Sequence, residues 1–148
     1  MKISIGCDHG ALALKNAVAE HLTKKGWKIL DLGVRKDSDP NDTDLMFHRV
    51  GLRVGAMISE GEYERALLFC GTGVGISIAA NKIKGIRACC CSDAYSAKLT
   101  RQHNNANVLC MGGRVVSGGL AEMMVDQFLE TEFEGGRHQR RVDMLETL

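Results

Sequence analysis

Short apolar runs alternate with longer amphipathic segments along the chain, and this alternation predicts strands separated by helices. The runs that read as strands are KISIG (2–6), WKILDLG (27–33), RALLFC (65–70), GIRACCC (85–91) and NVLCM (107–111). Segments with helical spacing lie at 11–26, 45–59, 75–82, 93–102 and 117–129. Gly26 stands where a helix C-terminal glycine belongs.

Strands that alternate with helices favour a parallel sheet covered on both faces, because parallel neighbours need crossover connections of about a dozen residues. We therefore expect an α/β fold, a Rossmann-like three-layer α/β/α sandwich with a five-stranded parallel sheet. A length of 148 residues, 45% of them apolar, suits one domain over residues 1–148. The segment 131–148 changes character at a double glycine, and we expect it to dock on a partner subunit.

Charge and composition narrow the possible partners. Nineteen basic and eighteen acidic residues leave a formal charge of +1, so no global field favours nucleic acid or an anionic membrane. The first residues lack the apolar core of a signal peptide, and no apolar run approaches the roughly 18 residues of a membrane span. We expect a cytoplasmic protein whose six cysteines are reduced thiols.

Candidate chemistry gathers in two turns that each follow a strand. In open α/β sheets, ligands lie beyond the carboxyl ends of the strands, where the strand order reverses. If the strands take the common order 2-1-3-4-5, that crevice lies between the first and third strands. The turn GCDHG would then place Cys7, Asp8 and His9 opposite Cys70 and Thr72 of the turn CGTGVG.

The glycines of the second turn give it the character of an anion site. Gly71, Gly73 and Gly75 tolerate positive φ and leave backbone N–H groups exposed at the start of a helix, where negative charge is favoured. The same field favours the thiolate form of a nearby cysteine. Cys70 is therefore a candidate base or nucleophile, and the alternative is a buried cysteine at a strand end.

A nucleotide remains an alternative ligand for this turn. The turn lacks the Gly-Lys-Ser/Thr of a P-loop, and Ile76 stands where the dinucleotide fingerprint needs its third glycine. Asp93 nevertheless follows the fourth predicted strand, about where a ribose-binding acid belongs. A nucleotide-binding or sensing domain without turnover therefore stays open.

Metal chemistry is a weaker interpretation of the cysteines. Cys7, His9 and Cys70 make a zinc site only if they converge. The triplet Cys89–Cys91 lacks the usual CxxC spacing, and neighbouring strand residues point to opposite faces, so we interpret all three as buried packing.

Other candidate residues lie late in the chain. TRQHNNANVL sets His103 and Asn104 in a polar turn before the fifth strand. A helix-to-strand turn lies at the opposite edge of the sheet from Cys70, so His103 can join that site only from another subunit. Arg137 and Arg141, four apart, would share one helix face and could clamp a phosphate, although a solvated basic face has the same pattern.

Six motifs together resemble the family of ribose-5-phosphate isomerase B and the galactose-6-phosphate isomerases. They are GCDHG, CGTGVGISIAANK, GIRA, RQHNNANVL, GGRVV and EGGRHQRRV, in order and at family-like intervals. Enzymes of this family are metal-independent homodimers, some forming tetramers, with active sites shared between subunits. The resemblance therefore implies a homodimer or tetramer, a sugar-phosphate substrate, and neither cofactor nor metal.

The resemblance also implies interconversion of ribose 5-phosphate and ribulose 5-phosphate through a cis-enediolate. Cys70 matches the thiolate base that carries a proton between C2 and C1, with Thr72 positioning the thiolate or a sugar hydroxyl. His103 matches the residue that opens the furanose ring by general acid–base transfer. The N–H groups of Gly71 through Gly75 would stabilise the enediolate oxygen.

The remaining matches concern substrate binding. Asp8 would hold the sugar hydroxyls, and Asn104 would assist the anion hole from the partner. The matches to phosphate-binding positions are His9, Arg114, Arg137 and Arg141. Binding the non-reacting phosphate holds the reacting carbons in place.

One departure bears on the substrate. Where the ribose enzymes carry DYP, with a tyrosine lining the sugar pocket, this chain reads DTDLMF and offers Thr43. Nothing else in the sequence obviously replaces that ring, so a hexose 6-phosphate such as allose or galactose 6-phosphate is the closest alternative substrate. A metal-dependent aldose isomerase is disfavoured, because the carboxylate-rich site that hard divalent cations prefer is absent from the motifs.

Overall fold

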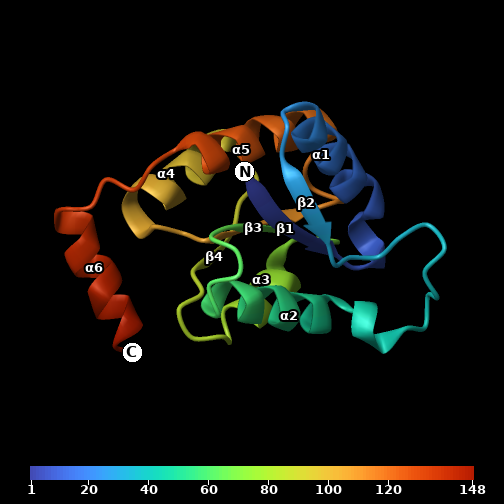
Figure 1. The fold of residues 1–148 in the computed structure, drawn as a ribbon, viewed down its shortest axis with the longest axis horizontal. Helices are drawn as coiled ribbons and strands as arrows, with labels where there is room; N and C mark the ends of the chain where they lie inside the picture. Colours follow the sequence, from blue (N-terminus) through green and yellow to red (C-terminus); the bar gives the residue numbers. More distant parts are fainter.

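A computed structural model describes residues 1–148, and it shows one parallel sheet between two layers of helices (Figure 1). The strands are β1 (Lys2–Cys7), β2 (Lys28–Asp31), β3 (Ala66–Cys70), β4 (Ala88–Cys90) and β5 (Val108–Gly112). The helices are α1 (Leu12–Lys24), α2 (Phe47–Ser59), α3 (Val74–Ala80), α4 (Ala94–Asn104), α5 (Gly118–Glu130) and α6 (Arg137–Glu146), with 3-10 turns at His9–Ala11 and Thr43–Leu45. The predicted α/β/α sandwich with a five-stranded parallel sheet is confirmed.

The strand order is β2-β1-β3-β5-β4, so the common order 2-1-3-4-5 is wrong in its last two places. Burial explains the exchange. Every residue of β5 is buried, whereas β4 has three residues, two half-buried and one exposed. The strand that is apolar on both faces takes the interior place, and the short one takes the edge. The reversal of strand order between β1 and β3 is as expected.

Two hydrophobic cores cover the sheet, one on each face. Alternate residues along β1 and β3, such as Ile5 and Phe69, pack with α1, α4 and α5, whereas Leu68 packs with α2 and α3. Figure 1 shows these two helical layers on opposite sides of the sheet. The same alternation puts Cys7 in the first core and Cys70 in the second.

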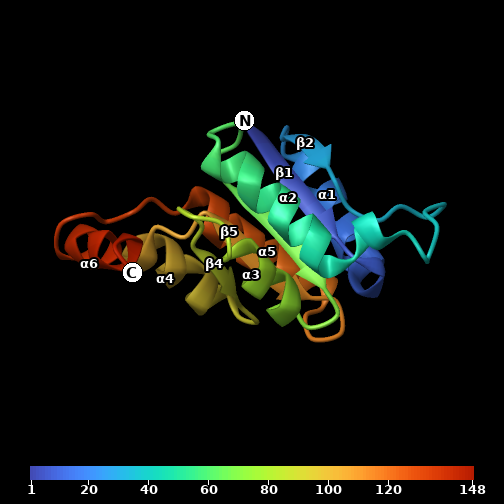
Figure 2. The ribbon, with the colours of Figure 1, turned by 90° about the horizontal axis from the view of Figure 1, so that it is seen from below.

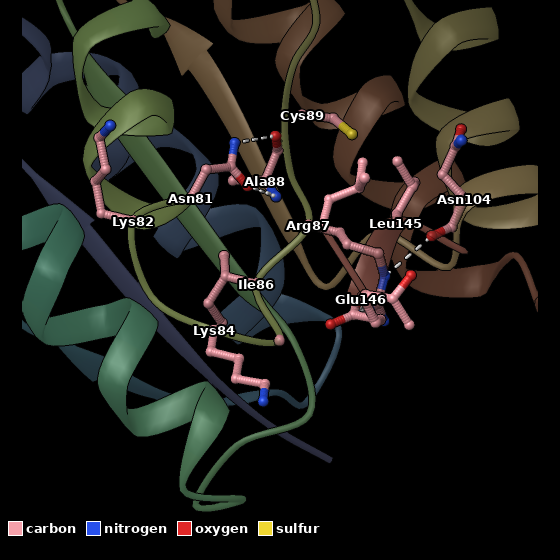
Figure 3. Close-up of a pocket in the computed structure, with 13 residues that line it drawn as sticks. Asn81, Lys82, Lys84, Ile86, Arg87, Ala88, Cys89, Asn104, Leu145 and Glu146 are labelled. Atoms are coloured by element: carbon pink, nitrogen blue, oxygen red, sulfur yellow. Dashed lines mark hydrogen bonds and ion pairs between the residues drawn. The ribbon is translucent and has the colours of Figure 1, made fainter. Parts of the chain in front are cut away.

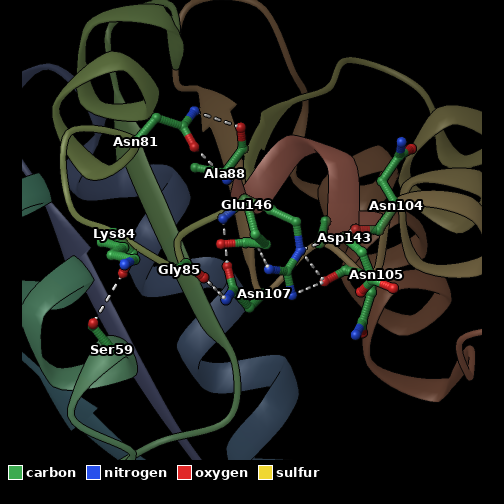
Figure 4. Close-up of polar contacts among 12 residues, drawn as sticks. Ser59, Asn81, Lys84, Gly85, Ala88, Asn104, Asn105, Asn107, Asp143 and Glu146 are labelled. Carbon is green, nitrogen blue, oxygen red and sulfur yellow. Dashed lines mark hydrogen bonds and ion pairs between the residues drawn. The ribbon is translucent and has the colours of Figure 1, made fainter. Parts of the chain in front are cut away.

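Helix α6 stands outside this sandwich and contacts α4. Figures 1 and 2 both place it at one end of the molecule, beside α4. Arg87 fastens it there: its guanidinium donates to the carbonyls of Asn104 at 3.1 Å and Asn105 at 3.0 Å, and it pairs with the carboxylate of Glu146 (Figure 4). The end of α4 and the end of α6 are thereby tied to the start of β4.

Several boundaries differ from the expected ones for local reasons. The helix expected from 45 begins at Phe47, because a 3-10 turn capped by Asp42 precedes it. The strand expected over 85–91 is reduced to β4, which starts at Ala88. There the side-chain amide of Asn81 donates to the Ala88 carbonyl and accepts from the Ala88 N–H. Gly26 takes φ +87° just after α1, which confirms its predicted place. No helix of the structure is long and apolar enough to cross a membrane.

Candidate functional site

Three turns meet at the carboxyl edge of the sheet, after β1, β3 and β5. The backbone N–H of Asp8 donates to the carbonyl of Phe69 at 3.2 Å, and that of Gly113 donates to the carbonyl of Cys70 at 2.9 Å. The N–H of Arg114 donates to Gly71 at 3.0 Å. The GCDHG turn therefore lies against the CGTGVG turn, at the place where the crevice was predicted. The third turn, with Arg114, completes it.

The Cys70 thiol lies at the centre of this arrangement. Cys70 is 5% exposed, and its Sγ accepts a hydrogen bond from the backbone N–H of Gly73 at 3.2 Å. Gly73 has φ +81°, and a Cβ there would lie 2.8 Å from the carbonyl carbon of Met111. Only glycine fits this position, and it presents an amide donor to sulfur. Helix α3 begins at the next residue and has only seven residues. We therefore attribute the interaction with the Cys70 sulfur to the Gly73 amide alone.

The polar side chains of the first two turns are arranged by short backbone contacts. Thr72 is exposed, and its hydroxyl accepts from the N–H of Val74 at 3.3 Å. Asp8 is half-buried, and one carboxylate oxygen accepts from the N–H of Gly10 at 2.9 Å. Both side chains are thus oriented by the turns in which they lie, within reach of the crevice.

A hollow of about 490 Å³ opens beside these turns, and basic side chains line it. Its lining includes His9, Gly113 and Lys36, and the guanidinium of Arg114 lies over Gly71 next to it. Sequence reasoning did not single out Lys36, which belongs to the polar loop before α2. A basic residue in that loop is the signal that would have suggested an anion site.

The other predicted residues lie at the opposite edge of the sheet. Val108, the first residue of β5, pairs with Ala66, whereas Cys70 pairs with Gly112. Four strand steps separate these pairs, about 13 Å along the sheet, and His103 and Asn104 precede β5. One chain therefore cannot bring His103 to Cys70, as the sequence predicted.

His103 instead joins a second group of residues where α4 meets α6. Its imidazole stacks on that of His138, with ring centroids 4.3 Å apart and 9° between the planes. Asn104, Arg137 and Arg141 are exposed at the same junction of α4 and α6. The predicted residues thus form two half-sites, one around Cys70 and one around His103.

A cavity of about 710 Å³ lies near the second half-site, and Asn104 is the one predicted site residue in its lining. Figure 3 shows Asn81, Lys82 and Lys84 on one side of it and Asn104, Leu145 and Glu146 on the other. The cavity includes neither Cys70 nor His103.

The cysteine predictions have mixed outcomes. Cys7 and Cys70 lie in opposite cores, so the zinc site that required them to converge is absent. Burial raises the pKa of Cys7 to about 11 and that of Cys91 to about 12. Cys90 is exposed, so the prediction that it is buried is wrong: β4 is an edge strand, and the Cys90 Sγ lies over the Thr72 carbonyl at 3.6 Å.

The nucleotide interpretation finds no support at Asp93. Its carboxylate accepts from the backbone N–H of Ser96 at 2.7 Å and caps α4. Hydrogen bonds from Ser96 lower the pKa of Asp93, as expected for an N-cap. A capping role accounts for this aspartate without a ribose.

An aromatic ring that the sequence did not single out packs against the glycine turn. A Cβ on Gly75 would lie 2.9 Å from the ring of Phe47, so this ring packs against the turn. Phe47 is 41% exposed and forms an edge contact with His48. Thr43 begins the 3-10 turn at Thr43–Leu45, four residues before Phe47, so its place opposite the tyrosine of the ribose enzymes stays a prediction.

Comparisons with known proteins show the family and agree with the fold. A profile of the Ribose/Galactose Isomerase family matches residues 3–145. Ribose-5-phosphate isomerase B of Escherichia coli is 46% identical over 144 residues, which are 97% of this chain and 93% of that protein. Among solved structures, the ribose-5-phosphate isomerase B of Clostridium thermocellum superposes with a TM-score of 0.92 at 44% identity, covering 99% of this chain and 96% of that one.

A further solved structure contains a ligand. The ribose-5-phosphate isomerase B of Mycoplasma genitalium, with bound ribulose-5-phosphate, superposes with a TM-score of 0.89 at 39% identity, covering 99% of this chain and 94% of that one. Fold, family profile and full-length relatives agree over nearly the whole sequence. The chain therefore belongs to the Ribose/Galactose Isomerase family.

Proposed function

We propose that the protein interconverts ribose 5-phosphate and ribulose 5-phosphate, an aldose and its ketose. The observation that carries the proposal is the Cys70 sulfur held by the Gly73 amide at 3.2 Å in the crevice between β1 and β3. The similarity to a relative whose structure holds ribulose-5-phosphate supports the choice of a pentose phosphate. The ring of Phe47 supplies an aromatic wall beside this crevice.

In the proposed reaction, Cys70 acts as a base toward the open-chain aldose. Its thiolate removes the proton from C2, the electron pair of that C–H bond forms a double bond between C1 and C2, and the carbonyl π pair moves onto O1 to give a cis-enediolate. The same thiol then returns the proton to C1 while the proton on O2 passes to O1 and the C2 carbonyl forms, which gives the ketose, so no net oxidant or reductant is needed. The Gly73 amide donates to Sγ and so orients it, and neighbouring N–H groups from Gly71 to Gly75 stabilise the enediolate oxygen.

The second half of the site comes, in our proposal, from another copy of the chain. His103 opens the furanose ring as a general acid–base, and Asn104 supports the anion hole. The segment 131–148 docks on the partner and delivers Arg137 and Arg141 to the phosphate. Two half-sites at opposite edges of one sheet make this arrangement necessary for His103 to reach Cys70.

The first half-site also contributes to binding. Asp8, oriented by its bond to Gly10, holds sugar hydroxyls, and Thr72 positions the thiolate or a hydroxyl. His9 and Arg114 hold the phosphate at the basic hollow, and we add Lys36 to them because it lines the same space. These contacts fix the non-reacting end of the substrate, so that C1 and C2 stay beside Cys70.

The experiment that tests the proposal measures ketose formation from ribose 5-phosphate, allose 6-phosphate and galactose 6-phosphate in the presence of a chelator. We expect turnover of the pentose phosphate by the wild type and a loss of about 10²–10⁴-fold in Cys70→Ala. Cys90→Ser is the matched control, since this exposed thiol lies near the same turn and has no role in the chemistry. Turnover that survives Cys70→Ala would contradict the thiolate mechanism.

A further inference from the structure

Three side chains with metal-binding atoms lie together where α4 meets α6 and the loop before it. Ligand atoms of His103, Glu134 and His138 all lie within 4.8 Å of one another. The two imidazole rings stack face to face, and the Nε2 atom of His138 lies 3.4 Å from a carboxylate oxygen of Glu134. Two histidines and one glutamate are a donor set that holds Zn²⁺ in proteins, with the fourth position left to water.

The backbone builds this cluster. The double glycine at 135–136 takes φ +64° and +55°, a conformation that suits glycine and reverses the chain into α6. The N–H of Glu134 donates to the carbonyl of Gln102 at 3.1 Å, which fixes Glu134 beside the residue that follows Gln102, His103. The N–H of His138 donates to the first glycine at 3.0 Å. The backbone conformation therefore holds the three donor side chains near one another.

The exposure of the three side chains and the bond lengths of zinc bear on the fit. His138 is 4% exposed. Zinc bonds of about 2.0–2.2 Å bring ligand atoms to about 3.3–3.5 Å from one another, so the donor atoms, now within 4.8 Å, must draw closer, and one of the two stacked imidazoles must turn so that both nitrogen lone pairs point at the ion. Glu134 is exposed and His103 half-buried, which leaves room for this movement.

One neighbour limits the affinity. The Nε atom of Arg137 lies 3.5 Å from the Nε2 atom of His138, so a metal ion would displace a guanidinium. Arg137 is exposed and can turn toward solvent. We therefore expect reversible zinc binding rather than a permanent structural zinc.

We propose that His103, Glu134 and His138 form a zinc-binding site, and that zinc bound there inhibits the enzyme by occupying His103. The binding stands on the geometry alone, whereas the inhibition rests on the proposed function, in which His103 opens the sugar ring. Zinc on this histidine leaves no nitrogen lone pair at the bound atom for proton transfer.

The binding test uses the full chain, zinc chloride and a chromophoric zinc chelator as competitor. We expect the wild type to compete for zinc, and Glu134→Gln to weaken the zinc affinity about tenfold or more, as ligand-shell changes do. Glu132→Gln, which changes an equally acidic and exposed neighbour two residues away, is expected to bind zinc as the wild type does. His138→Gln serves as a second variant, with circular dichroism as the check that each variant folds.

The inhibition test measures isomerisation with and without zinc in the same proteins. We expect zinc to inhibit the wild type and Glu132→Gln, a chelator to restore both, and Glu134→Gln to need about tenfold more zinc while keeping its zinc-free rate. Equal zinc affinity in wild type, Glu134→Gln and His138→Gln would place zinc on the thiols, Cys70 among them, and overturn the proposal. Zinc binding without any isomerisation would refute the proposed function and leave the site standing.

Discussion

Alanine at Gly73 should damage both the fold and the chemistry, and the structure gives the size of each effect. Gly73 has φ +81°, where a non-glycine residue costs about 1–2 kcal/mol. The new Cβ would lie 2.8 Å from the Met111 carbonyl carbon and 3.1 Å from the Gly112 nitrogen. These are backbone atoms of an interior strand, so overpacking adds about 1–3 kcal/mol. The free energy of unfolding should therefore fall by about 2–5 kcal/mol.

The same substitution moves the amide that binds the Cys70 sulfur. We expect kcat to fall about 10²–10³-fold, the cost of losing one anion-stabilising donor. Gly26→Ala is the matched control, since Gly26 has φ +87°, lies at the end of α1, and has no atom within 4 Å of the place that a Cβ would take. It should lose only about 1–2 kcal/mol and keep kcat.

Urea unfolding of the two variants measures the free energy of unfolding. Steady-state kinetics without urea measure kcat. A Gly73→Ala protein that is no less stable than Gly26→Ala and keeps the wild-type kcat would refute the reasoning. It would show that neither the close approach to β5 nor the amide–sulfur contact matters.

Three further predictions concern other parts of the molecule. Lys15→Met should lower the free energy of unfolding by about 2–4 kcal/mol, because it leaves the carboxylate of Asp31 without the Lys15 ammonium that lies 2.5 Å from it. Lys15 is 1% exposed, whereas Asp31 is partly exposed, so water offsets part of the loss. An unchanged midpoint of urea unfolding would contradict this. Phe47→Ala should raise the ratio of hexose to pentose phosphate kcat/KM about tenfold by opening the crevice beside Gly75, and a constant ratio would exclude Phe47 from the sugar pocket. Burial acts to raise the pKa of Asp126, but bonds from Lys25 and His21 lower it overall, so Asp126→Asn should cost about 0.5–1 kcal/mol at pH 7. That difference should shrink as the pH falls through about 4 and below, because the carboxylate is then protonated in both folded and unfolded chains; a difference independent of pH would argue against the ion pair.

The strand–helix alternation predicted the layers, the parallel sheet and the crevice, because each depends on local apolar spacing and on the chirality of crossover connections. The order of the last two strands could not be predicted in this way. It depends on which strand is buried on both faces, and VLCMG and ACC differ too little in composition to show it. The exposure of Cys90 follows from the same edge position.

The candidate site was predictable to the extent that its residues follow strand ends. Cys70, Asp8 and Arg114 meet because parallel strands end at one edge of the sheet. The Phe47 ring was missed because its contact with Gly75 depends on how α2 packs beside α3, which the order of residues along the chain does not show. Lys36 was missed because a long polar loop has no periodicity that reports where its side chains lie.

The grouping of His103, Glu134 and His138 also lay outside what the sequence could predict. It depends on how the double glycine at 135–136 reverses the chain and on where α6 packs against α4. Neither follows from a pattern of apolar residues, since α6 contributes only His138 and Val142 as buried residues.

The central claim is a site that combines Cys70 of one chain with His103 of another, and subunit mixing tests it most directly. Cys70→Ala and His103→Asn are each expected to be inactive alone. When the two are unfolded, mixed and refolded together, a two-fold dimer places one intact Cys70 beside one intact His103, so about a quarter of the wild-type activity should return. A mixture that stays as inactive as its components would contradict the shared site.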